Sequence, residues 1–171
     1  LRFATESRQV RLHFKPLPIT APAAERAGFH FDLTIDGDLI RSVSVAPGGE
    51  EAAFAELPAG DKVIEIWLSQ EIPVALTALQ GDAPCRPVKD PRPRWVTYGS
   101  SLTHCMRAHS PARTWPATVA RRRGLNLTSL GFGGQCALDA MVGMTIADLP
   151  AEFITLKLGI NTIGGALSAR T

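Results

Sequence analysis

In the first half of the chain, hydrophobic and polar positions alternate along short runs. Residues 10–15, 29–35 and 64–69 each carry an apolar side chain at every second position. Successive side chains of a strand point to opposite faces of a sheet, so each run predicts a β-strand with one buried and one solvent-facing side. Shorter apolar runs predict further strands at 43–45 and 74–79.

Turn-forming residues separate these runs. Asp36-Gly37-Asp38 predicts a hairpin, because glycine accepts a positive φ without steric cost. Pro47-Gly48-Gly49 predicts a second turn, and the alanine-rich residues 21–27 are expected to form a loop. Short alternating strands joined by such turns are typical of an antiparallel β-sandwich with one wet face per sheet. We therefore expect a jelly-roll-like β-sandwich domain over residues 1–85.

A proline-rich stretch follows this predicted domain. Four prolines lie between residues 83 and 93, and proline lacks the amide donor that the interior of a sheet requires. We expect a linker at residues 86–93, which would be the domain boundary.

The pattern changes after this linker. Buried-looking strands are predicted at 94–98, 125–130 and 153–158, with helices between them at 115–123 and 136–147. Strand–helix–strand alternation predicts a parallel α/β sheet over residues 94–171. Ligands bind at the carboxyl ends of the strands in such sheets. The glycine-bearing loops after Tyr98, Leu130 and Leu158 are therefore expected to converge at one edge.

Composition and charge exclude several classes of function. The net charge of +2 is too balanced for a nucleic-acid-binding face, and the basic run Arg121–Arg123 fits the negative end of a helix. No apolar stretch reaches the roughly 20 residues that span a bilayer, and no signal peptide is readable, which leaves the localisation open. The three cysteines, expected to be free thiols, lack zinc-site spacing, so we predict no metal.

The first candidate for chemistry is a serine after the strand at 94–98. In Gly99-Ser100-Ser101, Ser101 lies on a turn that could expose its hydroxyl as a nucleophile. The alternative is a serine that caps a helix N-terminus. The block is not the G-x-S-x-G nucleophile elbow, because residue 103 is threonine.

Two further loops offer hydrogen-bond donors. The run from Gly131 to Gly134 could aim a main-chain amide at an oxyanion, whereas a dinucleotide loop would need glycine where Cys136 stands. Asn161, after the strand at 153–158, could donate its side-chain amide to the same oxyanion. A turn-forming asparagine is the alternative there.

The order and setting of these three blocks resemble the SGNH (GDSL-type) hydrolase family. Residue by residue, the resemblance implies that Ser101 is the nucleophile and that Gly134 and Asn161 complete the oxyanion hole. It covers residues 94–165 and implies a three-layer, flavodoxin-like parallel-sheet domain. The predicted sandwich before it is similar to the N-terminal β domain of some carbohydrate esterases in this superfamily.

The sequence departs from the family pattern at several points. Ser100 and Thr162 stand where aspartate is usual, and the Asp-x-x-His block that supplies the base is absent. His104 and His109 are near Ser101 in sequence, but nearness in sequence does not make a supported base. With only three strands of the sheet, we expect the α/β domain to be incomplete at its C-terminus, as in an N-terminal part of a longer hydrolase.

The resemblance implies an esterase that forms an acyl-serine intermediate on short acyl esters, among them acetylated carbohydrates. No cofactor is expected, the expected partner is a small-molecule or carbohydrate ester, and the oligomeric state is open. The rival interpretation is a non-catalytic carbohydrate-binding module or a pseudoenzyme. A flavodoxin-like nucleotide binder is a third.

Overall fold

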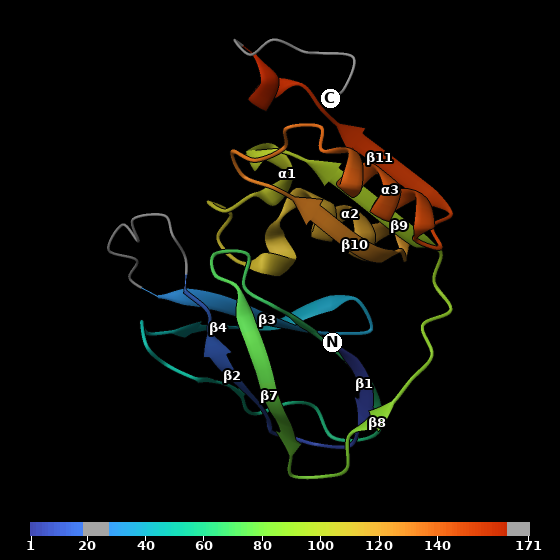
Figure 1. Ribbon diagram of the computed structural model, residues 1–171. Coiled ribbons are helices and arrows are strands. Elements are labelled where there is room, and N and C mark those ends of the chain that lie inside the picture. The colour runs from blue at the N-terminus through green and yellow to red at the C-terminus, as the bar shows by residue number, and fades with distance from the viewer. Residues whose placement is uncertain (19–27, 164–171) are drawn as a thin grey trace. The chain divides into compact units, whose positions relative to one another are not determined.

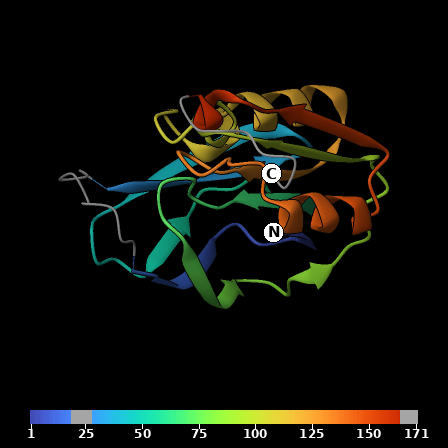
Figure 2. The same cartoon turned by 45° about the horizontal axis from the view of Figure 1, so that its top comes forward.

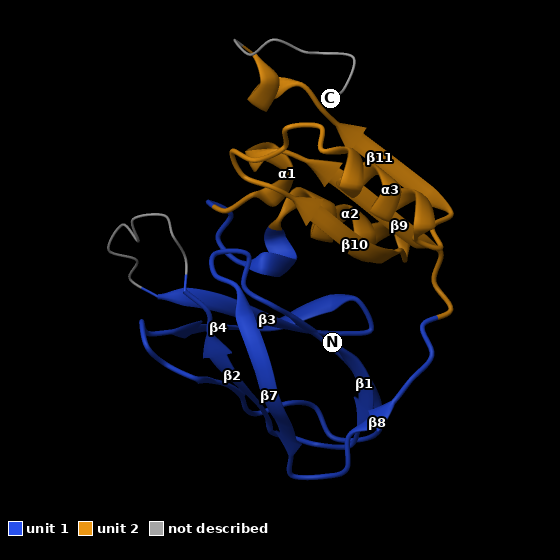
Figure 3. Ribbon diagram, in the orientation of Figure 1, with its two compact units in different colours: residues 1–90, 107–113 blue, residues 91–106, 114–171 orange. Residues whose placement is uncertain are grey.

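The computed structural model describes residues 1–18 and 28–163, so the loop predicted at 21–27 lies outside the described residues. The chain divides into two compact units, shown in different colours in Figure 3. Unit 1 comprises residues 1–90 and 107–113, and unit 2 comprises residues 91–106 and 114–171. The division differs from the predicted one for residues 107–113, which were expected in the α/β domain and belong to unit 1.

Unit 1 contains two antiparallel sheets. One has the strand order β4-β3-β6-β1-β8 and the other β5-β2-β7 (Figure 1). The strands are β1 (Arg2–Thr5), β2 (Val10–Pro16), β3 (Phe29–Ile35), β4 (Asp38–Val45), β5 (Glu51–Phe54), β6 (Lys62–Trp67), β7 (Val74–Gly81) and β8 (Arg86–Pro87). All five strands predicted in this half are present, whereas β1, β5 and β8 were not predicted.

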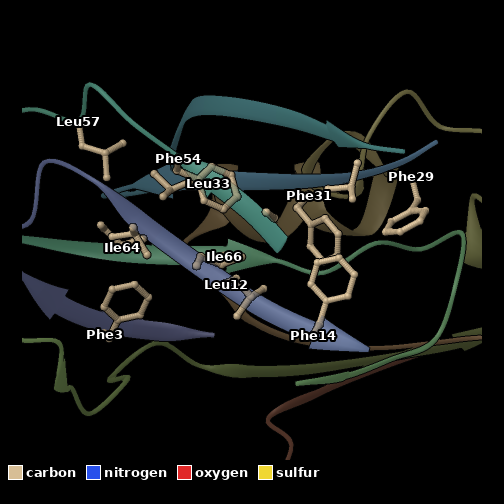
Figure 4. Close-up of a cluster of buried hydrophobic side chains, with 13 residues drawn as sticks. Phe3, Leu12, Phe14, Phe29, Phe31, Leu33, Phe54, Leu57, Ile64 and Ile66 are labelled. Atoms are coloured by element: carbon tan, nitrogen blue, oxygen red, sulfur yellow. The ribbon is translucent and has the colours of Figure 1, made fainter. Parts of the chain in front are cut away.

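Side chains from both sheets form a single hydrophobic core, drawn in Figure 4. Phe14 of β2 and Phe31 of β3 pack with ring centroids 4.7 Å apart and ring planes tilted by 36°, and Phe29 meets both rings edge-on. These are the inward positions that the period-two pattern indicates. Burying each large side chain of this kind stabilises the fold by about 1.5–3 kcal/mol.

Two predictions about this half are wrong in detail. Arg86 and Pro87 were assigned to a linker, but they form β8, in which Pro87 lies opposite Phe3 of β1. The proline is tolerated because β8 is the outermost strand of its sheet. Asp32 and Thr34 lie on the face of β3 that was expected to face solvent, but both residues are fully buried.

Unit 2 contains one parallel sheet with the strand order β10-β9-β11. Its strands are β9 (Arg94–Gly99), β10 (Asn126–Gly131) and β11 (Phe153–Lys157), and its helices are α1 (Ser101–His104), α2 (Trp115–Arg123), α3 (Ala140–Asp148) and the 3-10 turn η2 (Ile160–Thr162). Among the described residues no helix has the length and apolar character needed to span a membrane.

Helices α2 and α3 pack on opposite faces of this sheet (Figure 2). Trp95 of β9 faces Trp115 of α2, with ring centroids 6.0 Å apart. Val96 and Tyr98, which alternate with Trp95 along β9, instead pack with Ile146 of α3. The predicted helix 115–123 is present with the predicted bounds, and Gly124 ends it in the left-handed conformation at φ +61°.

The second predicted helix starts later than expected. Residues 136–147 were predicted, but α3 begins at Ala140, where the Asp139 carboxylate accepts a hydrogen bond from the Met141 N–H at 2.8 Å. The physical reason lies in two preceding residues. The Cys136 N–H is bonded to a side chain of another loop, and Leu138 has a φ of +63°, which a helix cannot accommodate.

Candidate active site

The turn after β9 presents Ser101. Ser101 is the first residue of α1 and is exposed, while Ser100 occupies the N-cap position. The Ser100 carbonyl oxygen accepts hydrogen bonds from the N–H groups of Thr103 and His104, each at 2.9 Å. The turn is therefore held by main-chain bonds, which leave the Ser101 side chain at the surface.

The N-cap alternative for the serine does not apply to Ser101. The capping position belongs to Ser100, whose side chain makes no capping hydrogen bond. Ser100 is fully buried, and its hydroxyl has no hydrogen-bond partner among the described residues. Of the two adjacent serines, only Ser101 has an exposed side chain that can meet a substrate.

The glycine-rich loop after β10 packs against this turn. Gly131 lies opposite Gly99 in the parallel register, and the Phe132 N–H donates to the Gly99 carbonyl at 2.8 Å. A Cβ on Gly131 would overlap the backbone N and Cα of His104. The loop can therefore approach α1 this closely only because residue 131 is glycine.

Gly134, further along the same loop, is glycine for a different reason. Its φ is +74°, and a Cβ there would meet nothing within 4 Å. Backbone conformation, not close packing, accounts for glycine at this position, because other residues rarely adopt this φ.

Asn161 reaches the glycine-rich loop from the end of β11. Its side-chain oxygen accepts a hydrogen bond from the Cys136 N–H at 3.1 Å, two residues after Gly134. That bond engages the acceptor end of the carboxamide, and its NH2 group makes no hydrogen bond within the described part of the chain. Asn161 is exposed, so the NH2 group can donate to a bound molecule.

The three loops are thus connected at the carboxyl edge of the sheet. The turn of Ser101 is bonded to the glycine-rich loop through Gly99, and that loop is bonded to Asn161 through Cys136. No hydrogen bond directly joins Ser101, Gly134 and Asn161 to one another within the described ranges. The arrangement leaves a hydroxyl, a main-chain amide and a carboxamide on neighbouring loops.

Tyr98 was not among the site residues predicted from the sequence, but its side chain packs against the glycine-rich loop. Its ring meets Phe132 edge-on at 5.7 Å. Burial, the adjacent Cys136 side chain and the nearby Asp139 raise the pKa of Tyr98 to about 12. The sequence shows that Tyr98 ends a buried strand, but it does not show which residues pack on the Tyr98 side chain.

The two histidines near Ser101 in sequence belong to different units. His104 is the one histidine of unit 2, and its ring lies against Gly133, where an added Cβ would be 2.8 Å from Nδ1. His109 belongs to unit 1, where its ring is 5.7 Å from that of His30. The cysteines are free, as predicted, and no group of three or more potential metal ligands occurs among residues 1–18 and 28–163.

Comparison with known proteins finds a family model that matches part of the chain. Residues 92–161 match the model of the GDSL-like lipase/acylhydrolase family. Among curated proteins, none is significantly similar to this chain.

Solved structures match nearly the whole chain. A salicylyl-acyltransferase from a tetracycline biosynthetic pathway is 32% identical with a TM-score of 0.84, over 95% of this chain and 48% of that one. A Bacteroides ovatus protein described as a GDSL-like lipase is 23% identical with a TM-score of 0.71, over 94% and 50%. A family two carbohydrate esterase from Clostridium thermocellum is 11% identical with a TM-score of 0.66, over 98% and 61%.

The chain therefore spans about half the length of the first two structures that it matches. The two structures under 25% identity show a shared fold, and the salicylyl-acyltransferase adds similarity in sequence. Residues 92–161 therefore resemble the GDSL-like lipase/acylhydrolase family in sequence, and the chain shares its fold with the solved structures.

Proposed function

We propose that this chain carries the nucleophile and oxyanion hole of a serine esterase that hydrolyses short acyl esters. Ser101 attacks the ester carbonyl, the C–O bond to the alcohol breaks and the alcohol leaves, and water then hydrolyses the acyl-serine to the acid and free Ser101. The N–H groups of Ser101 and Gly134 and the Asn161 NH2 stabilise the oxyanion of the tetrahedral intermediate.

The observation that carries this proposal is the bond between Asn161 and the Cys136 N–H. It fixes the carboxamide oxygen on the glycine-rich loop at 3.1 Å and leaves the NH2 group available for an oxyanion. The same loop is bonded to Gly99, two residues before Ser101. Oxyanion donors need such prior placement, because reorganisation during the reaction would consume the stabilisation that they provide.

Serine attack also needs a base, and the sequence contains no Asp-x-x-His block. Without a base, removal of the Ser101 proton and the later attack of water are both slow. We therefore expect weak turnover from these 171 residues alone and accumulation of the acyl-serine.

The test compares the chain with two neighbouring serine variants on p-nitrophenyl acetate. Ser101→Ala should reduce hydrolysis to the background rate and abolish the acetylated protein seen by intact mass spectrometry. Ser100→Ala should retain both signals, because the Ser100 hydroxyl is buried. His104→Ala in the same series tests whether His104 acts as the base. If Ser101→Ala is as active and as acetylated as the unmodified chain, the esterase is excluded and a pseudoenzyme or carbohydrate-binding protein is favoured.

Transfer to an acceptor other than water is a second candidate function. It is favoured by the 32% identity to a salicylyl-acyltransferase over 95% of this chain. Adding a small alcohol should then divert the acyl group from acid to ester product, whereas a strict hydrolase would give acid alone. Acetylated carbohydrates are the first natural esters to test, since carbohydrate esterases share the fold.

A further inference from the structure

Asp32 is a fully buried carboxylate on β3. One carboxylate oxygen, Oδ1, accepts a hydrogen bond from the Ser42 hydroxyl at 2.5 Å, and Ser42 lies directly opposite it on β4. The other, Oδ2, accepts from the Ala112 N–H at 2.7 Å. A buried charge is costly unless it is hydrogen-bonded, and these bonds are short and charge-assisted. Asp32 therefore holds one group of its own sheet and one group 80 residues away in sequence.

The distant group belongs to residues 107–113, here named the strap. The strap contacts the rest of unit 1 at three points along its length. The Ala108 carbonyl accepts from the Gln70 side chain at 3.1 Å, the His109 ring lies 5.7 Å from that of His30, and the Ala112 N–H bonds to Asp32. Ala112 is fully buried, so the strap is packed into unit 1.

The strap also follows, two residues later in the chain, the turn that carries Ser101 (residues 99–105), here named the nucleophile turn. The Cys105 N–H still bonds to the Ser101 carbonyl at 2.9 Å, and the strap begins two residues later. At its other end the chain enters α2, where the Trp115 indole N–H donates to the Leu102 carbonyl at 2.7 Å. The segment that leaves the turn of Ser101 thus continues from residues of unit 2 at both ends, and its own contacts lie within unit 1.

We propose that Asp32 is a positioning residue for the nucleophile turn and acts through the strap. The role given to Ser101 rests on the function proposed above, whereas the anchoring of the turn can be measured without any activity. Loss of the bond between Asp32 and the Ala112 N–H removes one of the three contacts of the strap, and the short helix α1 then has a weaker constraint on its C-terminal side. A four-residue helix has few bonds of its own, so its stability depends on such external constraints.

Hydrogen exchange of the 171-residue chain, followed residue by residue with NMR, tests this proposal. The reporters are the amides of Thr103, His104 and Cys105, which bond to the carbonyls of Ser100 and Ser101. Asp32→Val, which removes both hydrogen bonds, should accelerate their exchange by about tenfold or more. Asp32→Asn should stay within about twofold of the unmodified chain, since its oxygen can accept from Ala112 and its NH2 can donate to Ser42.

Two further variants keep the outcome decisive. Asp38→Val makes the same change at an exposed position on β4 and should leave the reporters unchanged. Ala112→Pro removes the N–H from the strap side and leaves the sheets intact, so it decides the matter if Asp32→Val does not fold. The proposal is overturned if the reporters keep their original rates, or if the amides of β6 accelerate by the same factor, which would indicate a general loss of stability. Neither result depends on whether Ser101→Ala abolishes hydrolysis.

Discussion

Gly131 and Gly134 have different physical requirements although they belong to one loop. Gly131 is constrained by space, because a Cβ would overlap the backbone of His104 and lie 2.8 Å from the Thr103 carbonyl carbon. Gly134 is constrained by its positive φ alone. A larger residue at 131 must therefore move the loop relative to α1, whereas one at 134 strains the backbone locally.

Gly131→Ala should consequently lower Ser101-dependent ester hydrolysis by about 10²-fold, because a displacement of about 1 Å between reacting groups can cost that much. The loss should fall on kcat, since the substrate contacts themselves remain. Gly143→Ala in α3 is the matched control, as a Cβ there meets nothing within 4 Å. Equal kcat values for both alanine variants would contradict this account of the loop.

Asn161→Ala should reduce hydrolysis by about 10²–10³-fold, which corresponds to about 2.7–4 kcal/mol of lost transition-state stabilisation. The change also leaves the Cys136 N–H without its acceptor, so the glycine-rich loop loses one anchor. Asn126→Ala, at the other asparagine of the chain, should be active at the original rate. Steady-state kinetics on p-nitrophenyl acetate would measure both variants, and an Asn161→Ala enzyme of full activity would rule out the oxyanion role.

Tyr98 gives a pH-dependent signal that can be read directly, because it is the one tyrosine of the chain. Burial first, and Cys136 and Asp139 next, raise its pKa from 10.0 to about 12. The folded state thus favours the neutral phenol. This contribution to stability is fully present below pH 10 and is lost as the pH rises towards 12. Absorbance near 295 nm should show ionisation near pH 12 in the folded chain and near pH 10 in denaturant. Ionisation near 10 in both states would contradict the buried position.

Among the elements, β11 and α3 stand out by their exposed apolar side chains. Phe153, Ile154 and Leu156 of β11 are each about half exposed, at 54%, 49% and 54%, and Met141 and Met144 of α3 are more exposed still. Strands of parallel sheets are normally covered on both faces. Apolar surface of this kind, next to a strand edge, favours association.

The isolated 171-residue chain should therefore self-associate as its concentration rises. Replacing Ile154 and Leu156 together with lysine should shift it towards the monomer, as measured by light scattering coupled to size-exclusion chromatography. Leu17→Lys removes a comparably exposed leucine in unit 1 and should have no such effect. A monomer at all concentrations would show that these side chains do not drive association.

Elements whose signals are local could be predicted from the sequence. Helix α2 has the expected bounds because Thr114 caps its start and Gly124 its end. The start of α3 was misplaced because the Cys136 N–H bonds to Asn161, 25 residues further along the chain. A bond of that range leaves no periodic pattern. The edge strand β8 was missed for a similar reason, since its pairing with β1 spans most of unit 1.

For the molecule as a whole, the sequence predicted the order of the three site blocks along the chain. It did not predict the residues that hold those blocks in place. The glycines and the asparagine at strand ends indicated which loops would meet, and contacts through Gly99 and Cys136 connect those loops. The buried Asp32 was read as part of a wet face, because alternation predicts which side of a strand a residue occupies but not what covers that side. The covering residues 107–113 lie in a distant part of the sequence.

The path of the chain through its two units has a consequence for protein engineering. The backbone changes unit after Asp90, after Met106 and after Arg113, so neither unit is one uninterrupted stretch of the gene. A protein expressed from Pro91 onwards would carry residues 107–113 away from the carboxylate that binds them, and a protein ending at Asp90 would leave that carboxylate short of a donor. Grafting the N-terminal unit onto another enzyme would therefore require transplanting a seven-residue peptide along with it.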